Sequence, residues 1–250
     1  MANLLITGVS RGIGRAAARY FAERGHTVYG CYRWSPEYLS EAECVNDLTG
    51  ELPGVTLLPC DVSDRDSCGE MIASLSGVPL AGIVNNAAVF TPNPWQDFDI
   101  ALWDKAMEIN LTAPLRLVHG LRDQIITGGS IVNMSSTDAY SAGYSDIAYA
   151  ASKAGLMSLT KSLAALLAPR KVRVNAVANG WTDTGMAMNP AVLEAVHYKT
   201  PLGRMSTAQE VVDVVDFLLF GGSSFITGSV IRVDGGYASV DEVLKREAGY

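Results

Sequence analysis

A tyrosine and a lysine four positions apart, Tyr149 and Lys153, are the first residues in this sequence that could carry out chemistry together. Residues at positions i and i+4 share one face of a helix, so the phenol and the ammonium can act on one site. A phenol with a pKa near 10 is a poor acid–base catalyst at neutral pH, and a nearby cation lowers that pKa. Lowering it by about 3 units takes roughly 4 kcal/mol, which we expect Lys153 to contribute in a desolvated site.

Polar or small residues also follow three apolar runs that are typical of buried strands. Ser136 lies at the end of one run, Asn86 and Ala87 at the end of a second, and Asp61 with Val62 beyond a third. In open sheets of parallel strands, ligands bind at the carboxyl ends of the strands. These residues are therefore expected to meet near Tyr149 and Lys153, which gives the pair a context that its spacing alone lacks.

A glycine-rich turn occupies the transition from the first apolar run to the first helical pattern. Glycine permits a tight turn and lets backbone approach a ligand, and the helix that follows presents free N–H groups to a pyrophosphate. The spacing is Gly-x3-Gly-x-Gly, unlike the commoner Gly-x-Gly-x2-Gly of dinucleotide-binding proteins. An ordinary turn that packs a helix on a strand is the alternative. The predicted cofactor contacts here are Gly8, Ser10, Arg11, Gly12, Ile13 and Gly14.

Arg33, at the end of the second apolar run, predicts which dinucleotide is bound. An acid at this place bonds the ribose of NAD, whereas an arginine accommodates the 2′-phosphate of NADP. No acid follows until Glu37, and Arg33 can hold a phosphate by charge and fork geometry, with help from Arg11. The alternative is a solvated surface charge. We expect NADP(H) rather than NAD(H).

Seven short apolar runs alternate with longer helical patterns along the whole chain, which predicts an α/β fold. Near-continuous apolar runs are typical of strands covered on both faces, and strand–helix alternation predicts a doubly wound parallel sheet of the Rossmann type. We expect one domain, residues 1–250, with a substrate loop at about 181–203 and a short tail at 238–250. The predicted strands are 4–6, 27–31, 55–58, 82–85, 130–134, 172–177 and 229–233, with helices at 13–24 and 149–168 and a capping box at 207–210.

Composition excludes several function classes. The 250 residues carry a net charge of −7, 48% are hydrophobic and 18% are charged, so neither a disordered chain nor a nucleic-acid or anionic-membrane partner is expected. No apolar run reaches the roughly 18 residues of a membrane span. The four cysteines have no zinc-binding spacing, so we expect no metal site, and a chain without a targeting signal fits the cytoplasm.

Taken together, these motifs resemble the short-chain dehydrogenase/reductase family in its short, single-domain branch. The resemblance covers essentially the whole chain. The matching segments are TGVSRGIG (7–14), Asp61-Val62, NNAA (85–88), Asn110, Ser136, YAASK (149–153), NGWTDT (179–184) and VDGGY (233–237).

The resemblance implies a role for each matching residue. Tyr149 would be the acid/base for a carbonyl oxygen while hydride passes between it and the nicotinamide. Lys153 would lower the pKa of Tyr149, with the charge of the oxidised nicotinamide assisting, and would bond the nicotinamide ribose. Ser136, rather than Ser135, would hold the carbonyl oxygen, and Asn110 would bend its helix around a water that relays protons to Lys153. The remaining implied cofactor contacts are Asp61 and Val62 at the adenine, Asn86 with Ala87 near the adenosine ribose, and Thr182 and Thr184 at the carboxamide and phosphates.

Two residues depart from the family pattern. Ala88 stands where the family usually has glycine, and Asn179 where it usually has proline. Losing that proline frees the backbone before the substrate loop, so we expect a changed or more mobile loop.

The function that this resemblance implies is an NADP(H)-dependent oxidoreductase that interconverts a ketone and a secondary alcohol. A 3-oxoacyl, steroid, sugar-derived or secondary-metabolite ketone is possible, and a homotetramer or homodimer is expected. Two alternatives stay open: a catalytically silent NADP-binding regulator, and a non-redox enzyme on the same fold. The predicted pocket walls are 87–90, Asp138, Tyr140, Tyr144, Ile147, Trp181 and 186–197, where His197 is expected to be a surface residue.

Overall fold

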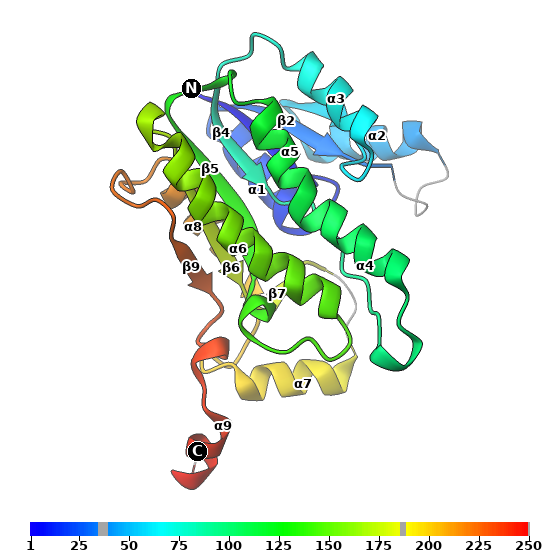
Figure 1. The fold of residues 1–250 in the computed structure, drawn as a ribbon, viewed down its shortest axis with the longest axis vertical. Coiled ribbons are helices and arrows are strands. Elements are labelled where there is room, and N and C mark those ends of the chain that lie inside the picture. Colours follow the sequence, from blue (N-terminus) through cyan, green and yellow to red (C-terminus); the bar gives the residue numbers. More distant parts are fainter. Residues whose placement is uncertain (35–39, 186–188, 250) are drawn as a thin grey trace.

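Seven parallel strands form one twisted sheet in the computed structural model, which describes residues 1–34, 40–185 and 189–249 (Figure 1). The sheet order is β3-β2-β1-β4-β5-β6-β9. Successive strands are added in one direction from β1 to β3 and in the opposite direction from β4 onward, so the strand order reverses between β1 and β4. This is the doubly wound arrangement expected from the sequence. The strands are β1 (Asn3–Thr7), β2 (Thr27–Tyr32), β3 (Val55–Pro59), β4 (Leu80–Asn85), β5 (Ile125–Ser136), β6 (Arg173–Asn179) and β9 (Val230–Val233).

Helices cover both faces of the sheet, as right-handed crossovers between parallel strands require. One buried cluster joins the sheet to α1 (Gly12–Glu23), α2 (Glu41–Glu51) and α8 (Ala208–Leu219). The other joins it to α3 (Arg65–Ser74), α5 (Ala113–Gly120) and α6 (Ile147–Leu167). In Figure 1, α4 (Ile100–Met107), α5 and α6 lie in front of the sheet.

The helix ends follow the signals in the sequence. Thr207 and Glu210 form the expected capping box at the start of α8. Gly25, just past α1, has a positive φ of 79°, which glycine adopts without strain. Helix α6 ends at Leu167, and Pro169 lies in the short 3-10 turn η4 (Ala168–Arg170).

The apolar residues of α6 pack mostly within the chain. Leu156, Met157 and Leu163 are buried, whereas Leu166 is 74% exposed. Helix α6 therefore exposes less apolar surface, and so less material for an oligomer contact, than its leucine-rich sequence suggests. The homotetramer or homodimer remains a prediction.

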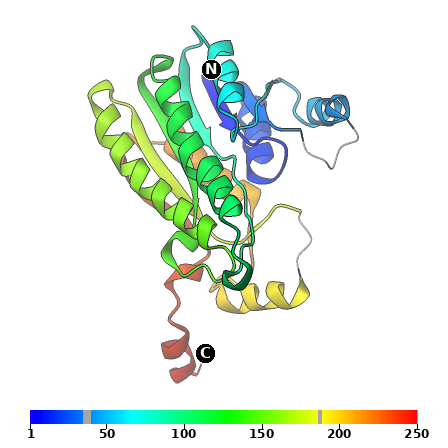
Figure 2. The same ribbon diagram turned by 45° about the vertical axis from the view of Figure 1, so that its right-hand side comes forward.

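The last segments of the chain lie beyond the carboxyl ends of the strands (Figures 1 and 2). Helix α7 (Pro190–Lys199) belongs to the expected substrate loop, and the tail forms η5 (Tyr237–Ser239) and α9 (Glu242–Glu247). The Lys245 ammonium donates to the Tyr198 carbonyl at 2.9 Å, so the tail contacts the end of α7. The parts of the expected loop at residues 186–188, and Glu37, lie outside the described residues. No helix among the described residues is long and apolar enough to cross a membrane.

Candidate active site

The glycine-rich turn joins β1 to α1 and has no room for side chains at two of its glycines. A Cβ at Gly14 would lie 2.2 Å from the Gly8 carbonyl oxygen, and one at Gly8 would lie 2.8 Å from the Ala87 Cα. Gly8 and Gly12 both have positive φ, at 74° and 59°. The backbone is therefore shaped for close approach, and this shape requires glycine.

Thr7 and Asn86 hold that turn against the end of β4. The Thr7 hydroxyl oxygen accepts hydrogen bonds from the backbone N–H groups of Asn86 at 3.0 Å and Ala87 at 2.9 Å. The Asn86 amide donates to the carbonyls of Thr7 at 2.9 Å and Gly8 at 3.1 Å. Asn86, expected at the adenosine ribose, thus holds the turn with its side chain. Thr7 was not among the predicted site residues, although a hydroxyl ending an apolar strand is a signal that could have identified it.

The rest of the turn faces α1 and the substrate loop. Arg11 precedes α1, and Ser10 accepts a hydrogen bond from Arg15 through its carbonyl. Ile13 is partly buried against the core of the sheet. A Cβ at Gly12 would lie 3.2 Å from the Thr184 methyl group, so Thr184 lies close to the turn, and its contact with cofactor remains a prediction.

Arg33 and Asp61 come together at the ends of β2 and β3. Their side chains form an ion pair at 3.5 Å, with Arg33 51% and Asp61 36% exposed. Burial alone would raise the pKa of Asp61, but hydrogen bonds from Ser63 and the charge of Arg33 outweigh burial and lower it. Val62 is buried beside this pair. The predicted 2′-phosphate and adenine contacts therefore lie next to each other.

Ser136 ends β5, and its side chain lies near the phenol of Tyr149. The neighbouring Ser135 side chain instead donates to the Lys153 carbonyl at 3.0 Å, because successive residues of a strand face opposite ways. This is consistent with the choice of Ser136 over Ser135. The Ser136 hydroxyl also donates to the Asp138 carboxylate at 3.2 Å and accepts from the Asp138 backbone N–H at 3.1 Å.

Lys153 is 3% exposed and its ammonium lies 5.5 Å from the centre of the Tyr149 ring. It donates to the Met134 carbonyl at 2.7 Å, and burial lowers its pKa to about 8. The structure differs here from the expected lowering of the Tyr149 pKa. Burial and the charge of Asp138 raise the pKa of Tyr149 to about 12, although a hydrogen bond with Ser136 opposes the shift.

Asn110 lies in a π-helical turn, η2 (Glu108–Thr112), between α4 and α5. A π turn widens a helix and is frequent at functional sites, and Asn110, where the resemblance implies a bend, lies within this one. The Asn110 side chain accepts from the Val89 N–H at 2.8 Å and donates to the Val89 carbonyl at 3.0 Å. It also donates to Ser152 at 3.1 Å, which fixes it against the helix that carries Tyr149 and Lys153.

Side-chain hydrogen bonds stabilise the loop that follows β6. Asn179 donates to the Gly180 carbonyl at 3.0 Å, and the Thr182 and Ser206 hydroxyls are 2.9 Å apart. Asn179 pairs in register with Ser136, so the loop starts beside the Ser136 end of β5. Asn179, which departs from the family pattern, thereby supplies a side-chain hydrogen bond that proline could not make.

One aromatic residue of the predicted pocket wall packs against Tyr149, and two others are exposed to solvent. The rings of Phe90 and Tyr149 lie edge to face with centres 5.5 Å apart, and Phe90 is 54% exposed. Tyr144 and Trp181 are 91% and 40% exposed. His197 lies exposed on α7, in agreement with its expected surface position.

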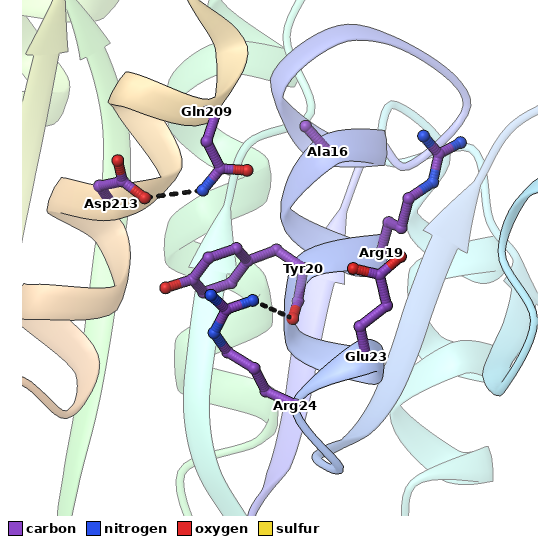
Figure 3. A pocket seen from close by; sticks show the side chains of 7 residues that line it. All are labelled: Ala16, Arg19, Tyr20, Glu23, Arg24, Gln209 and Asp213. Carbon is purple, nitrogen blue, oxygen red and sulfur yellow. Dashed lines mark hydrogen bonds between the residues drawn. The ribbon is translucent and has the colours of Figure 1, made fainter.

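A separate polar hollow lies between α1 and α8 (Figure 3). The Arg24 guanidinium covers the Tyr20 ring at 3.5 Å from its centre, and Gln209 donates to Asp213 at 2.7 Å. The hollow contains none of the predicted catalytic or cofactor residues, and several of its polar groups already have hydrogen-bond partners, among them Arg19 with Glu51 and Tyr20 with Asp216.

The residues at the sheet edge fit a dinucleotide. The turn at Gly8 and Gly14 leaves no space for a Cβ, which suits a backbone that approaches pyrophosphate. Arg33 supplies a half-exposed cation beyond β2. In the described part of the chain, no cluster of three or more His, Cys, Asp or Glu residues could hold a metal ion.

Known proteins are similar to this chain over most of its length. Residues 8–238 match a family model described as enoyl-(acyl carrier protein) reductase. The chain is 36% identical to Protein FixR of Bradyrhizobium diazoefficiens over 93% of this chain and 85% of that protein. It is 34% identical to the cis-4-hydroxycyclohexanecarboxylate dehydrogenase of Sinomonas cyclohexanicum over 94% and 96%.

Solved structures are similar over nearly the whole chain. A putative gluconate dehydrogenase from Agrobacterium tumefaciens superposes with a TM-score of 0.86 at 29% identity, covering 96% of this chain and 97% of the other. A 3-oxoacyl-[acyl-carrier protein] reductase with bound NAD from Brucella melitensis gives 0.82 at 33% identity, covering 94% and 91%. The protein belongs to the short-chain dehydrogenase/reductase family of oxidoreductases.

Proposed function

We propose that the protein is an NADP(H)-dependent oxidoreductase that interconverts a ketone and a secondary alcohol, with reduction as the favoured direction. The observation that carries the proposal is the convergence of Ser136, Tyr149 and Lys153 at the carboxyl ends of the strands. There the glycine turn leaves backbone open to a dinucleotide.

Tyr149 supplies the proton. The bound dinucleotide supplies the hydride for the carbonyl carbon. The Tyr149 hydroxyl protonates the carbonyl oxygen, and a pKa of about 12 keeps the phenol protonated at neutral pH, which suits an acid in the reductive direction. Ser136 bonds the carbonyl oxygen, and the positive charge of Lys153 stabilises the phenolate that remains. In the oxidative direction, the charge of an oxidised nicotinamide would add to that of Lys153.

Lys153 and Asn110 hold this arrangement in place. The ammonium of Lys153 is fixed by the Met134 carbonyl, from which it can reach a ribose hydroxyl. Asn110 ties the π turn to α6 through Ser152, and we assign to it the proton relay that the family resemblance implies. Asp61, Val62, Ala87, Thr182 and Thr184 are the proposed cofactor contacts beyond the turn.

Arg33 is the reason for choosing NADP(H) over NAD(H). Its guanidinium is half-exposed and paired only loosely, at 3.5 Å, with Asp61, so it can turn to a 2′-phosphate. The solved Brucella relative holds NAD, so the choice for this chain depends on Arg33 and not on that similarity.

The other expectations remain part of the proposal. The substrate is a small-molecule ketone or alcohol, the chain forms a homotetramer or homodimer, and neither nucleic acid nor membrane is a partner. Four buried free cysteines support a reducing compartment such as the cytoplasm. A silent NADP-binding regulator and a non-redox enzyme are the alternatives.

The test is NADPH oxidation by purified protein across a chemically diverse ketone panel, with NADH run in parallel. Tyr149→Phe should abolish turnover and leave NADPH binding, measured by fluorescence, within threefold of wild type. NADPH binding without turnover of any ketone would favour the silent regulator. A more than tenfold loss of NADPH affinity in Tyr149→Phe would contradict the role assigned to the phenol.

A further inference from the structure

Asp138 is a carboxylate next to the reacting groups for which the proposed mechanism has no use. It lies two residues after Ser136, in the 3-10 turn η3 (Thr137–Tyr140), and its side chain is partly buried. The Ser136 hydroxyl donates to it at 3.2 Å while accepting from the Asp138 N–H at 3.1 Å. A serine hydroxyl has one proton to donate. As long as Ser136 donates its hydrogen bond to Asp138, it cannot donate to a carbonyl oxygen.

Asp138 takes part in none of the ion pairs found in the described part of the chain. Among the described residues, no lysine, arginine or histidine forms an ion pair with it, and the Lys153 ammonium bonds the Met134 carbonyl instead. The other charged group nearby is the carboxylate of Asp146, which adds negative charge. Burial raises the pKa of Asp138, and its charge helps to raise the pKa of Tyr149. Within the described residues Asp138 therefore has no cationic partner, and its carboxylate accepts from the same Ser136 hydroxyl that the proposed mechanism assigns to the carbonyl oxygen.

We propose that Asp138 determines specificity by selecting ketones that carry a hydrogen-bond donor, hydroxyl or ammonium, on the carbon next to the carbonyl. The donor binds the Asp138 carboxylate, and the Ser136 hydroxyl is then released to donate to the carbonyl oxygen. The 3.2 Å between the serine and carboxylate oxygens suits a substrate with its two polar groups on adjacent carbons. The inference depends on the proposed reductase function.

The same carboxylate disfavours substrates that place an anion at this position, because like charges repel in a poorly solvated site. A simple ketone leaves Asp138 bonded to Ser136 and is held by Tyr149 alone. Discrimination of this kind can be large, because a ketone without the donor lacks both the hydrogen bond to Asp138 and the one from Ser136 to its carbonyl oxygen.

The experiment starts from each ketone that the wild-type protein reduces with NADPH. Its kcat/KM is compared with that of analogues in which the adjacent carbon carries a hydroxyl, an ammonium or, as the matched control, a methyl group. We expect at least a tenfold advantage of a donor analogue over the methyl analogue. Equal values for all three would overturn the inference and leave the reductase function standing. The reductase function fails separately, if no ketone is reduced.

Two variants separate specificity from simple support of the fold. Asp138→Ala should lower the donor preference at least fivefold, while kcat/KM for the methyl analogue holds or rises because Ser136 is freed. Asp146→Ala, which removes a nearby carboxylate without a bond to Ser136, should keep the preference. NADPH fluorescence checks that both variants bind cofactor. An equal loss for donor and methyl analogues in Asp138→Ala would show a structural role and overturn the inference.

Discussion

Replacing Thr7 by valine tests whether a single hydroxyl holds the phosphate-binding turn. Thr7 is 2% exposed, and its oxygen accepts from two backbone N–H groups, those of Asn86 and Ala87. Valine keeps the branched shape and removes the acceptor. Each buried donor left without a partner costs about 1–3 kcal/mol. Asn86 and Ala87 are only partly buried, so water can compensate in part, and we expect a total loss of about 2–4 kcal/mol.

The assay is equilibrium urea unfolding together with thermal melting. For a chain of this length 1 kcal/mol shifts Tm by about 2–4 °C, so Thr7→Val should melt roughly 5–15 °C below wild type. The affinity for NADPH should fall about tenfold as the turn loosens, since each 1.4 kcal/mol is a factor of ten. Thr7→Ser, which keeps the hydroxyl, is the matched control and should stay much closer to wild type. A Thr7→Val protein within 0.5 kcal/mol of wild type would refute this reasoning.

Three further predictions concern the cofactor site and the proton donor. Gly14→Ala would place a Cβ 2.2 Å from the Gly8 carbonyl oxygen and should weaken NADPH binding at least a hundredfold by titration calorimetry, whereas Gly69→Ala, with open space, should not. Arg33→Ala should raise the KM for NADPH at least tenfold with little change for NADH; an unchanged ratio would mean that other residues read the 2′-phosphate. Lys153 has a pKa lowered to about 8, so it loses its charge above that pH, and ketone reduction should decline there; a rate constant flat to pH 10 would contradict the prediction.

The sheet could be predicted from the sequence because its strands are marked by local patterns. Each predicted strand overlaps an observed one, since apolar runs covered on both faces differ plainly from the helical patterns between them. The boundaries differ most in β5, which starts at Ile125 rather than at residue 130. Gly128 and Gly129 interrupt the apolar pattern, so the sequence does not indicate that the strand begins before them.

The sequence by itself also determined where the chemistry gathers. Polar residues at the ends of parallel strands must meet at one edge of the sheet, which places Ser136, Asn86 and Asp61 without any knowledge of side-chain direction. The glycine spacing and the Tyr149–Lys153 pair then predict a dinucleotide site and a proton donor at this edge.

Only the tertiary structure decided how these side chains are used. Burial and the charge of Asp138 raise the pKa of Tyr149, where the sequence predicts that Lys153 lowers it. Thr7 holds the glycine-rich turn, Asp138 accepts a hydrogen bond from Ser136, and Arg33 pairs with Asp61. The physical reason is common to all of these: a pKa and a hydrogen bond depend on burial and on distances of a few ångströms between segments far apart in the chain, and local spacing does not encode them.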